Sequence, residues 1–230
     1  YMSKLKHEDM EQDVLIEYSS RFLHFYNTNK AVVWGVGIAV VLIIAFVIFY
    51  FVNQSQKESE AQVLLGTAEE YLMSGEYERA LYGDDAAFEP GFVQIADNYQ
   101  GTSSGNLANY YAAVAFHELE SHEEALEYIE RFEVPSGIMG VGPISFHAVL
   151  LSELGRHDEA ADRFVDAAQW DLNESTTPYN LWEAAVAYET AGNYDLAIEQ
   201  LDTIIEEYEN SPVVPEAQRL RGMLTARLGR

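Results

Sequence analysis

The sequence predicts an all-α protein in which a single N-terminal transmembrane helix is followed by an α-solenoid of repeated helix pairs. Two observations predict this fold class. Residues 31–52 run for 22 positions without a charged side chain. A short motif of glycine, an aromatic residue and alanine recurs between residues 75 and 201. No segment shows the two-residue alternation of apolar and polar residues that is typical of a strand.

The first element is a short arm, residues 1–30. Its larger apolar residues recur at three- and four-residue steps, which predicts a partly helical arm with one apolar stripe: Val14, Tyr18, Phe22 and Phe25. Such a stripe could lie on the membrane surface or on a partner protein.

The second element is the span itself, residues 31–52. As a helix it would reach about 33 Å, enough to cross a hydrocarbon core of about 30 Å. Trp34 near one end and Phe49 near the other fit the aromatic belts of the two interfaces. A cleaved signal peptide is disfavoured, because the apolar run is too long and an arm precedes it. Small residues that could let the span pack against other membrane helices are Gly35, Gly37 and Ala39.

Charges beside the span predict its orientation. Arg21 and Lys30 precede it closely, whereas only Lys57 follows it closely. Because positively charged flanks stay on the cytoplasmic side, a margin of one residue places the arm in the cytoplasm and residues 53–230 across the membrane.

The recurring motif is clearest at residues 192–201, GNYDLAIEQL, and it returns as GEYERAL at 75–81 and GRHDEAADRF at 155–164. A degraded copy is ESHEEALEYI at 120–129. The motif alanines are 45, 35 and 37 residues apart: Ala80, Ala125, Ala160 and Ala197. A second set of alanines lies seven residues before each turn: Ala68, Ala113, Ala148 and Ala185.

This spacing is typical of the tetratricopeptide repeat (TPR), a unit of about 34 residues with helix A, a turn and helix B. Glycine or a polar residue makes the turn, the aromatic residue begins helix B, and alanine sits where the two helices cross closely. The alternative is an unrelated helical bundle with coincidental alanines. Four copies in a compatible order favour the repeat.

Residues 53–230 are therefore predicted to form a TPR domain of about four repeats and a capping helix. A polar link at 53–60 leads into a first repeat helix at 58–74, and GDDAAFEPG at 83–91 cuts its partner helix short. A replacement helix follows, marked by Phe92, Ile95, Ala96 and Tyr99. The second repeat begins after GTSSG, the third covers 141–170, the fourth 177–209, and the cap 213–228.

Charge excludes some classes of function. The net charge is −25, and residues 53–230 hold 9 basic and 33 acidic residues. Such a surface repels phosphate, so nucleic-acid binding is excluded. It could attract a basic partner, but a generally acidic, salt-adapted surface is the interpretation that we favour. The chain has no cysteine, which excludes disulfides and cysteine-liganded zinc.

No catalytic, cofactor or metal site is expected. HELESH at 117–122 resembles a zinc-protease box, which requires histidines four residues apart on one helix. His117 and His122 are five apart, about 140° apart around one helix. GVG at 140–142 lacks the preceding strand of a phosphate loop. No small-molecule substrate follows from such a sequence.

Repeat arrays of this kind bind peptide or protein in the groove lined by their A helices. By motif position the groove residues would be Leu65, Tyr110, Val114, His117, Ser152, Tyr179, Trp182 and Glu189. In the alternative interpretation, Tyr179 and Trp182 only pack between repeats.

The order of the segments resembles that of the YfgM-like family of membrane-anchored TPR proteins. It is an arm ending RFLHFYNTNK, the span directly after it, the polar link and the repeats. Residues 82–116 are similar to a stretch typical of members from one bacterial lineage. They read YGDDAAFEPGFVQIADNYQGTSSGNLANYYAAVAF. The resemblance implies an ancillary partner of the Sec translocon in the inner membrane. It also implies a periplasmic repeat domain that associates with a periplasmic chaperone and helps emerging secreted proteins. The alternative is a scaffolding or assembly subunit of another membrane complex, such as a respiratory or outer-membrane secretion machine.

Overall fold

A computed structural model describes residues 24–84 and 86–229. Most of the predicted arm and its apolar stripe, together with residues 85 and 230, lie outside the described residues. The chain divides into two compact units, residues 1–56 and 57–230. Regular structure in the described part is helical, apart from one isolated bridge between Asp84 and Glu89. The predicted all-α fold class is confirmed.

The first unit contains the candidate membrane span. It belongs to helix α2, Lys30–Met73, whose apolar window near its start is long enough to cross a membrane and is nowhere buried. This window fits a single-pass membrane anchor. Gly35 and Ala39 are four residues apart and share one face of α2. Gly37 lies nearly opposite them, so the three small residues lie on two faces of α2.

The second unit begins with the last part of α2, which buries Ala61, Leu65 and Ala68. Helix α3, Tyr77–Tyr82, is only six residues long. A loop follows whose ends approach so closely that a Cβ at Gly83 or Gly91 would collide with backbone atoms. Helix α4, Phe92–Asn98, then buries Phe92, Ile95 and Ala96, the side chains expected of a replacement helix.

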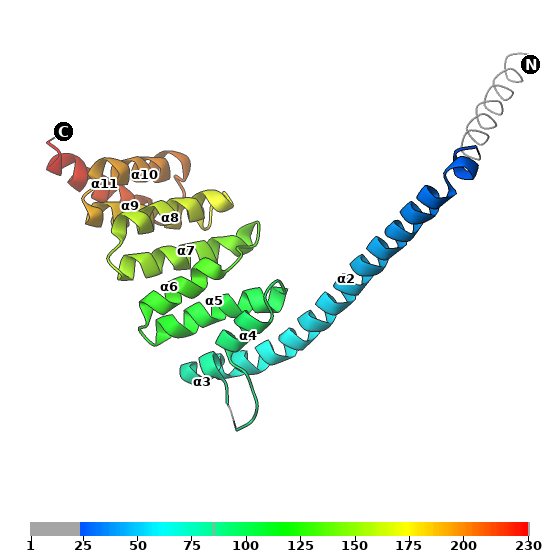
Figure 1. Ribbon diagram of the computed structural model, residues 1–230. Helices are drawn as coiled ribbons and strands as arrows, with labels where there is room; N and C mark the ends of the chain where they lie inside the picture. Colours follow the sequence, from blue (N-terminus) through cyan, green and yellow to red (C-terminus); the bar gives the residue numbers. More distant parts are fainter. Residues whose placement is uncertain (1–23, 85, 230) are drawn as a thin grey trace, which may run out of the picture. The chain divides into compact units, whose positions relative to one another are not determined.

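The remaining helices follow one another in chain order, and each packs against its neighbours (Figure 1). They are α5 (Ser103–Glu118), α6 (His122–Arg131), α7 (Ile138–Glu153), α8 (His157–Trp170), α9 (Thr177–Ala191), α10 (Tyr194–Glu207) and α11 (Val214–Arg227). Helices α5/α6, α7/α8 and α9/α10 form three successive pairs, and α8 packs against both α7 and α9. Helix α7 packs less extensively against α6 than α9 does against α8.

The α2–α3 turn and the turn inside each of the three helix pairs have the same backbone hydrogen bonds. In the α5–α6 turn, Glu120 N–H donates to the His117 carbonyl at 2.9 Å, and Ser121 N–H donates to the Phe116 carbonyl at 2.9 Å. This is the Schellman motif, which needs a residue in the left-handed region. Three turns use glycine there, at Gly75, Gly155 and Gly192, whereas Glu120 adopts φ 59°.

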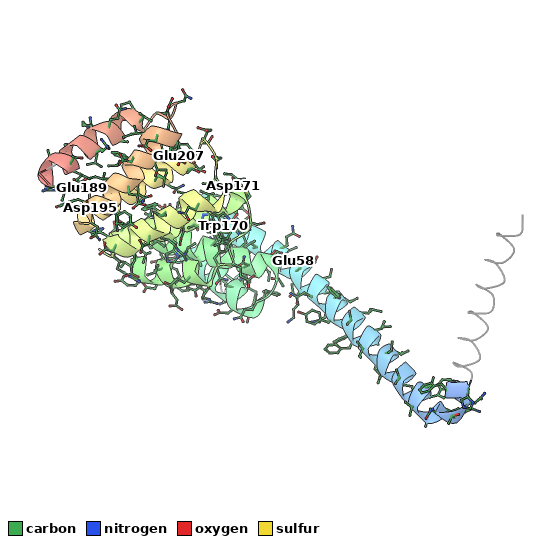
Figure 2. All side chains as sticks on the ribbon, turned by 90° about the horizontal axis from the view of Figure 1, so that it is seen from above. Glu58, Trp170, Asp171, Glu189, Asp195 and Glu207 are labelled. Carbon is green, nitrogen blue, oxygen red and sulfur yellow. The ribbon has the colours of Figure 1, made fainter. Side chains whose placement is uncertain are left out.

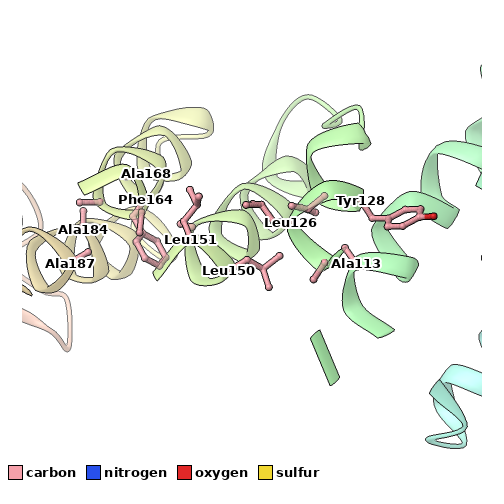
Figure 3. Close-up of a cluster of buried hydrophobic side chains, with 14 of the residues drawn as sticks. Ala113, Leu126, Tyr128, Leu150, Leu151, Phe164, Ala168, Ala184 and Ala187 are labelled. Atoms are coloured by element: carbon pink, nitrogen blue, oxygen red, sulfur yellow. The ribbon is translucent and has the colours of Figure 1, made fainter. Parts of the chain in front are cut away.

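The repeated alanines lie where the helices cross. The four alanines of the B helices have no exposed surface, and those of the A helices are at most 1% exposed. Without longer side chains the helix backbones approach closely. Larger side chains fill the space between crossings, among them Leu126, Leu150, Leu151 and Phe164, and the buried cluster continues from one helix pair to the next (Figure 3).

A carboxylate from α2 caps helix α5. Glu58, labelled in Figure 2, accepts hydrogen bonds from the backbone N–H of Ser103 at 2.6 Å and of Ser104 at 3.1 Å. The Ser104 hydroxyl donates to the same carboxylate at 2.7 Å. The first N–H groups of a helix have no partner within the helix and favour negative charge. Glu58 therefore ties the first repeat helix to the second repeat.

Candidate protein-binding surface

One face of the A helices α5, α7 and α9 carries a regular set of half-buried side chains. Residues at i, i+4 and i+7 of each helix share this face, and the equivalent residues of successive helices are 35 and 37 residues apart. We call this set the A-helix stripe. It consists of Tyr110, Val114 and His117 on α5, Ser145, Val149 and Ser152 on α7, and Trp182, Val186 and Glu189 on α9.

Contacts join the stripe from one helix to the next. The Tyr110 ring lies 6.1 Å from the ring of Phe146, and the His117 ring lies 5.4 Å from it. The Ser145 hydroxyl donates a hydrogen bond to the Asn180 side-chain oxygen at 2.6 Å, which links α7 to α9. Neighbouring A helices are therefore in contact beside the stripe, whose middle row consists of valines.

Six of the eight residues expected in the groove belong to the stripe. The other two differ from it in opposite ways. Leu65 is 4% exposed and belongs to the core, so it offers almost no surface to a partner. Tyr179 is 47% exposed at the beginning of α9. Trp182 packs against the core while keeping part of its surface exposed. Glu189, labelled in Figure 2, lies on the same helix, α9.

Sequence reasoning missed three members of the stripe, Ser145, Val149 and Val186. Their positions follow from the same 35- and 37-residue offsets that relate His117, Ser152 and Glu189. Applying the offsets to every groove position, rather than choosing polar and aromatic residues, would have found them.

The aromatic end of the stripe is apolar. Tyr110 contacts the rings of Tyr111 and Phe132 as well as that of Phe146. Burial raises the pKa of the Tyr110 hydroxyl, and burial together with a hydrogen bond to Glu69 raises the pKa of Tyr111 to about 12. Both hydroxyls stay neutral, as an apolar contact surface requires.

The other end of the stripe is polar. Nδ1 of His117 lies 3.1 Å from Oε2 of Glu153, and Nδ1 of His122 lies 3.0 Å from the same oxygen. A separation of about 140° would hold only if both histidines were on a single helix. The chain turns at Glu120 instead, so that His117 is on α5, His122 is the first residue of α6, and both face the last residue of α7.

Another histidine, His147, is buried between α7 and α8. His147 is 8% exposed, and its Nδ1 accepts a hydrogen bond from Arg163 Nε at 3.3 Å. Burial, with the nearby charges of Arg163 and Arg156, lowers the pKa of His147 to about 4. Glu130 approaches the other ring nitrogen at 3.9 Å, and Asp166 pairs with Arg163. The arrangement keeps His147 neutral as a structural hydrogen-bond acceptor.

The loop between α6 and α7 packs against the end of α8. The indole nitrogen of Trp170 donates to the Pro135 carbonyl at 3.1 Å. A Cβ at Gly140 would lie 2.2 Å from both that carbonyl oxygen and the indole nitrogen. Gly140 is therefore required by close approach rather than by its backbone angles.

Comparisons with known proteins support a TPR protein. The sequence profile of the tetratricopeptide repeat matches residues 183–230. Among solved structures, the chain is similar to one of TPR-like repeats assigned to a kinesin light chain of Podosopora anserina, repeats that are nearly identical to one another. The TM-score is 0.53 and the identity 15%, over 75% of this chain and 88% of that chain. A single-residue variant of the same protein matches with a TM-score of 0.53 and 16% identity over the same shares. At these identities the likeness concerns the fold. No curated protein matches the chain in sequence.

The fold is thus a TPR-like α-solenoid preceded by a long apolar helix. TPR repeats are protein-interaction scaffolds, so protein partners are indicated.

Proposed function

We propose that the chain is a membrane-anchored TPR adaptor that associates with the Sec protein translocon. It would bind a periplasmic chaperone or emerging secreted proteins on the A-helix stripe. The observation that supports the adaptor role is the stripe itself. The same three positions on each of three A helices are half-buried, and polar and aromatic side chains lie on either side of a row of valines. An extended or partly folded chain could contact such a surface without one fixed sequence.

The choice of the translocon rests on the resemblance of the whole chain to the YfgM-like family. The apolar part of α2 supports an anchor, because its uncharged residues exceed the length needed to cross the bilayer. In this proposal the arm lies in the cytoplasm and residues 53–230 lie in the periplasm.

Topology is tested by adding protease to intact spheroplasts. A periplasmic repeat domain should be digested, leaving a small fragment that carries the span. Full-length protein that survives this treatment but not lysis would place the repeat domain in the cytoplasm and contradict the proposal.

The anchor partner is tested with a photo-crosslinking residue in the span, in native membranes. Gly35 and Ala39 share one face of α2, so both positions should trap a translocon subunit, while Gly37 on the opposite face is the matched control. Failure to trap any translocon component from either face would refute the association. Trapping of respiratory or outer-membrane secretion subunits would favour the scaffolding alternative.

The stripe is tested separately, by placing the crosslinking residue at Ser152 or Glu189. Both should trap a chaperone or a secreted chain, whereas Glu199, an exposed residue on the B helix α10, should not. Equal trapping from all three positions would show that the stripe is not the binding surface.

A further inference from the structure

We infer that His117, His122 and Glu153 form a binding site for a divalent transition-metal ion, with Zn²⁺ the ion that best fits the ligands. The site joins the turn between α5 and α6 to the end of α7. This inference does not depend on the adaptor function proposed above. It rests on the positions of three side chains from three helices, and it adds a metal where the sequence predicted none.

The distances suit coordination. One ligand atom from each of the three residues lies within 4.8 Å of the other two. The Glu153 oxygen is 3.1 Å from Nδ1 of His117 and 3.0 Å from Nδ1 of His122. Two ligands bound at about 2.1 Å to a tetrahedral Zn²⁺ are themselves about 3.4 Å apart, so small rotations of the rings bring all three ligands to one ion.

The two nitrogens lack another role. Both Nδ1 atoms are buried, and neither has a hydrogen-bond partner among the described residues, because the contacts with Glu153 do not have hydrogen-bond geometry. Buried polar atoms are normally paired, since leaving one unpaired costs about 1–3 kcal/mol. A metal ion at the meeting point of the two nitrogens and the carboxylate oxygen would satisfy all three.

The type of ligand selects the type of ion. Imidazole nitrogen favours zinc, copper, nickel and iron over magnesium and calcium, which prefer oxygen ligands. Two histidines and one carboxylate are a set that binds Zn²⁺ and leaves a fourth position for water. The side chains are 27%, 28% and 36% exposed, so an ion can enter from solvent. The surrounding segment HELESHEE adds four acidic residues, which raise the local concentration of cations.

The rest of the local structure does not need the ion. The α5–α6 turn is closed by its own backbone hydrogen bonds, and the His117 ring packs on Phe146. The ion would instead fasten α5 and α6 to α7, at the junction where α6 and α7 pack less extensively than α8 and α9 do. Its effect would be to hold the α5/α6 pair against the α7/α8 pair.

The test uses the full chain, extracted in mild detergent, stripped with EDTA and titrated with Zn²⁺ against a chromophoric chelator. Excess Mg²⁺ occupies the exposed carboxylates during the titration. We expect one Zn²⁺ per chain, and a midpoint of thermal unfolding about 5–10 °C higher at a hundredfold excess over Kd.

Two variants remove a ligand, and one is a matched control. His122→Ala and Glu153→Gln should each weaken Zn²⁺ binding more than about 100-fold, since loss of an outer partner alone costs about 10–100-fold. His157 is the matched control, because it begins α8 as His122 begins α6, and its Nδ1 faces Ser152 at 3.4 Å rather than a carboxylate. His157→Ala should bind Zn²⁺ as the natural chain does.

Far-UV circular dichroism in EDTA checks that each variant folds. If His122→Ala does not fold, the comparison is made with Glu153→Gln alone. The inference is wrong if the natural chain loses all Zn²⁺ to the chelator. It is equally wrong if the folded ligand variants bind Zn²⁺ like the natural chain, or if His157→Ala weakens binding as much as they do.

Discussion

Replacing Glu120 with glycine should stabilise the protein. Glu120 occupies the left-handed position of the α5–α6 turn with φ 59°, where the other three turns have glycine. Its side chain is exposed, so little contact is lost with it. The substitution tests whether the four turns are one motif with one energetic requirement.

The magnitude follows from two opposing contributions. A residue with a Cβ costs about 1–2 kcal/mol in the left-handed region. Glycine loses more backbone entropy on folding, about 0.5–1 kcal/mol. The net effect of Glu120→Gly is a gain of about 1 kcal/mol in the free energy of unfolding. For a chain of this length, that raises the midpoint of thermal unfolding by about 2–4 °C.

The assay is denaturation of the full chain in detergent and EDTA, followed by far-UV circular dichroism. Glu120→Gln is the charge control, because it removes one negative charge and keeps the strained backbone. It should change the free energy of unfolding by less than about 0.5 kcal/mol. The reciprocal change, Gly155→Glu, should lose about 1 kcal/mol, since a Cβ at Gly155 meets no atom within 4 Å and only its backbone angle is unfavourable. Equal stability of the Gly and Gln variants would refute the reasoning.

Three further predictions concern other contacts in residues 57–230. Glu58→Ala should lower the free energy of unfolding by about 1.5–3 kcal/mol in chemical denaturation, because the first N–H groups of α5 lose a charged acceptor. Gly140→Ala should cost about 1–3 kcal/mol and change tryptophan fluorescence, because the new methyl group would collide with the indole of Trp170. In the folded chain the pKa of His147 is lowered to about 4, whereas an unperturbed histidine has a pKa of about 6.5. As pH falls between these values, His147 is protonated in the unfolded chain but not in the folded one, so the free energy of unfolding falls by up to about 3 kcal/mol. Denaturation at several pH values should show this slope in the natural chain and a smaller slope in His147→Gln, and an unchanged slope would contradict the assignment.

The fold was predictable because its determinants are local and repeated. The glycine, aromatic and alanine positions lie within one helix pair. Because they recur in four copies, they can be recognised although the rest of the sequence varies. The same periodicity predicts most of the A-helix stripe, because equivalent positions in a repeat face the same way. Leu65 is the exception: it holds the stripe position in the first repeat but is buried there.

Contacts between repeats were not predictable in this way. The cap that Glu58 provides crosses 45 residues to reach Ser103. The meeting of His117 and His122 with Glu153 depends on where the α5–α6 turn and the end of α7 fall in space. Helical spacing describes positions within one helix, so it cannot detect a cluster that three helices assemble.

The helix order of residues 57–230 also has a consequence for folding kinetics. Helices pack almost entirely against helices next to them in the chain, so native contacts form without closing long loops. Chains with such low contact order fold fast, and folding can begin at any helix pair and spread to its neighbours. A ribosome releases α3 to α6 before α7 to α11 exist. The first helix pairs can therefore bury their shared alanines while the rest of the chain is still being synthesised.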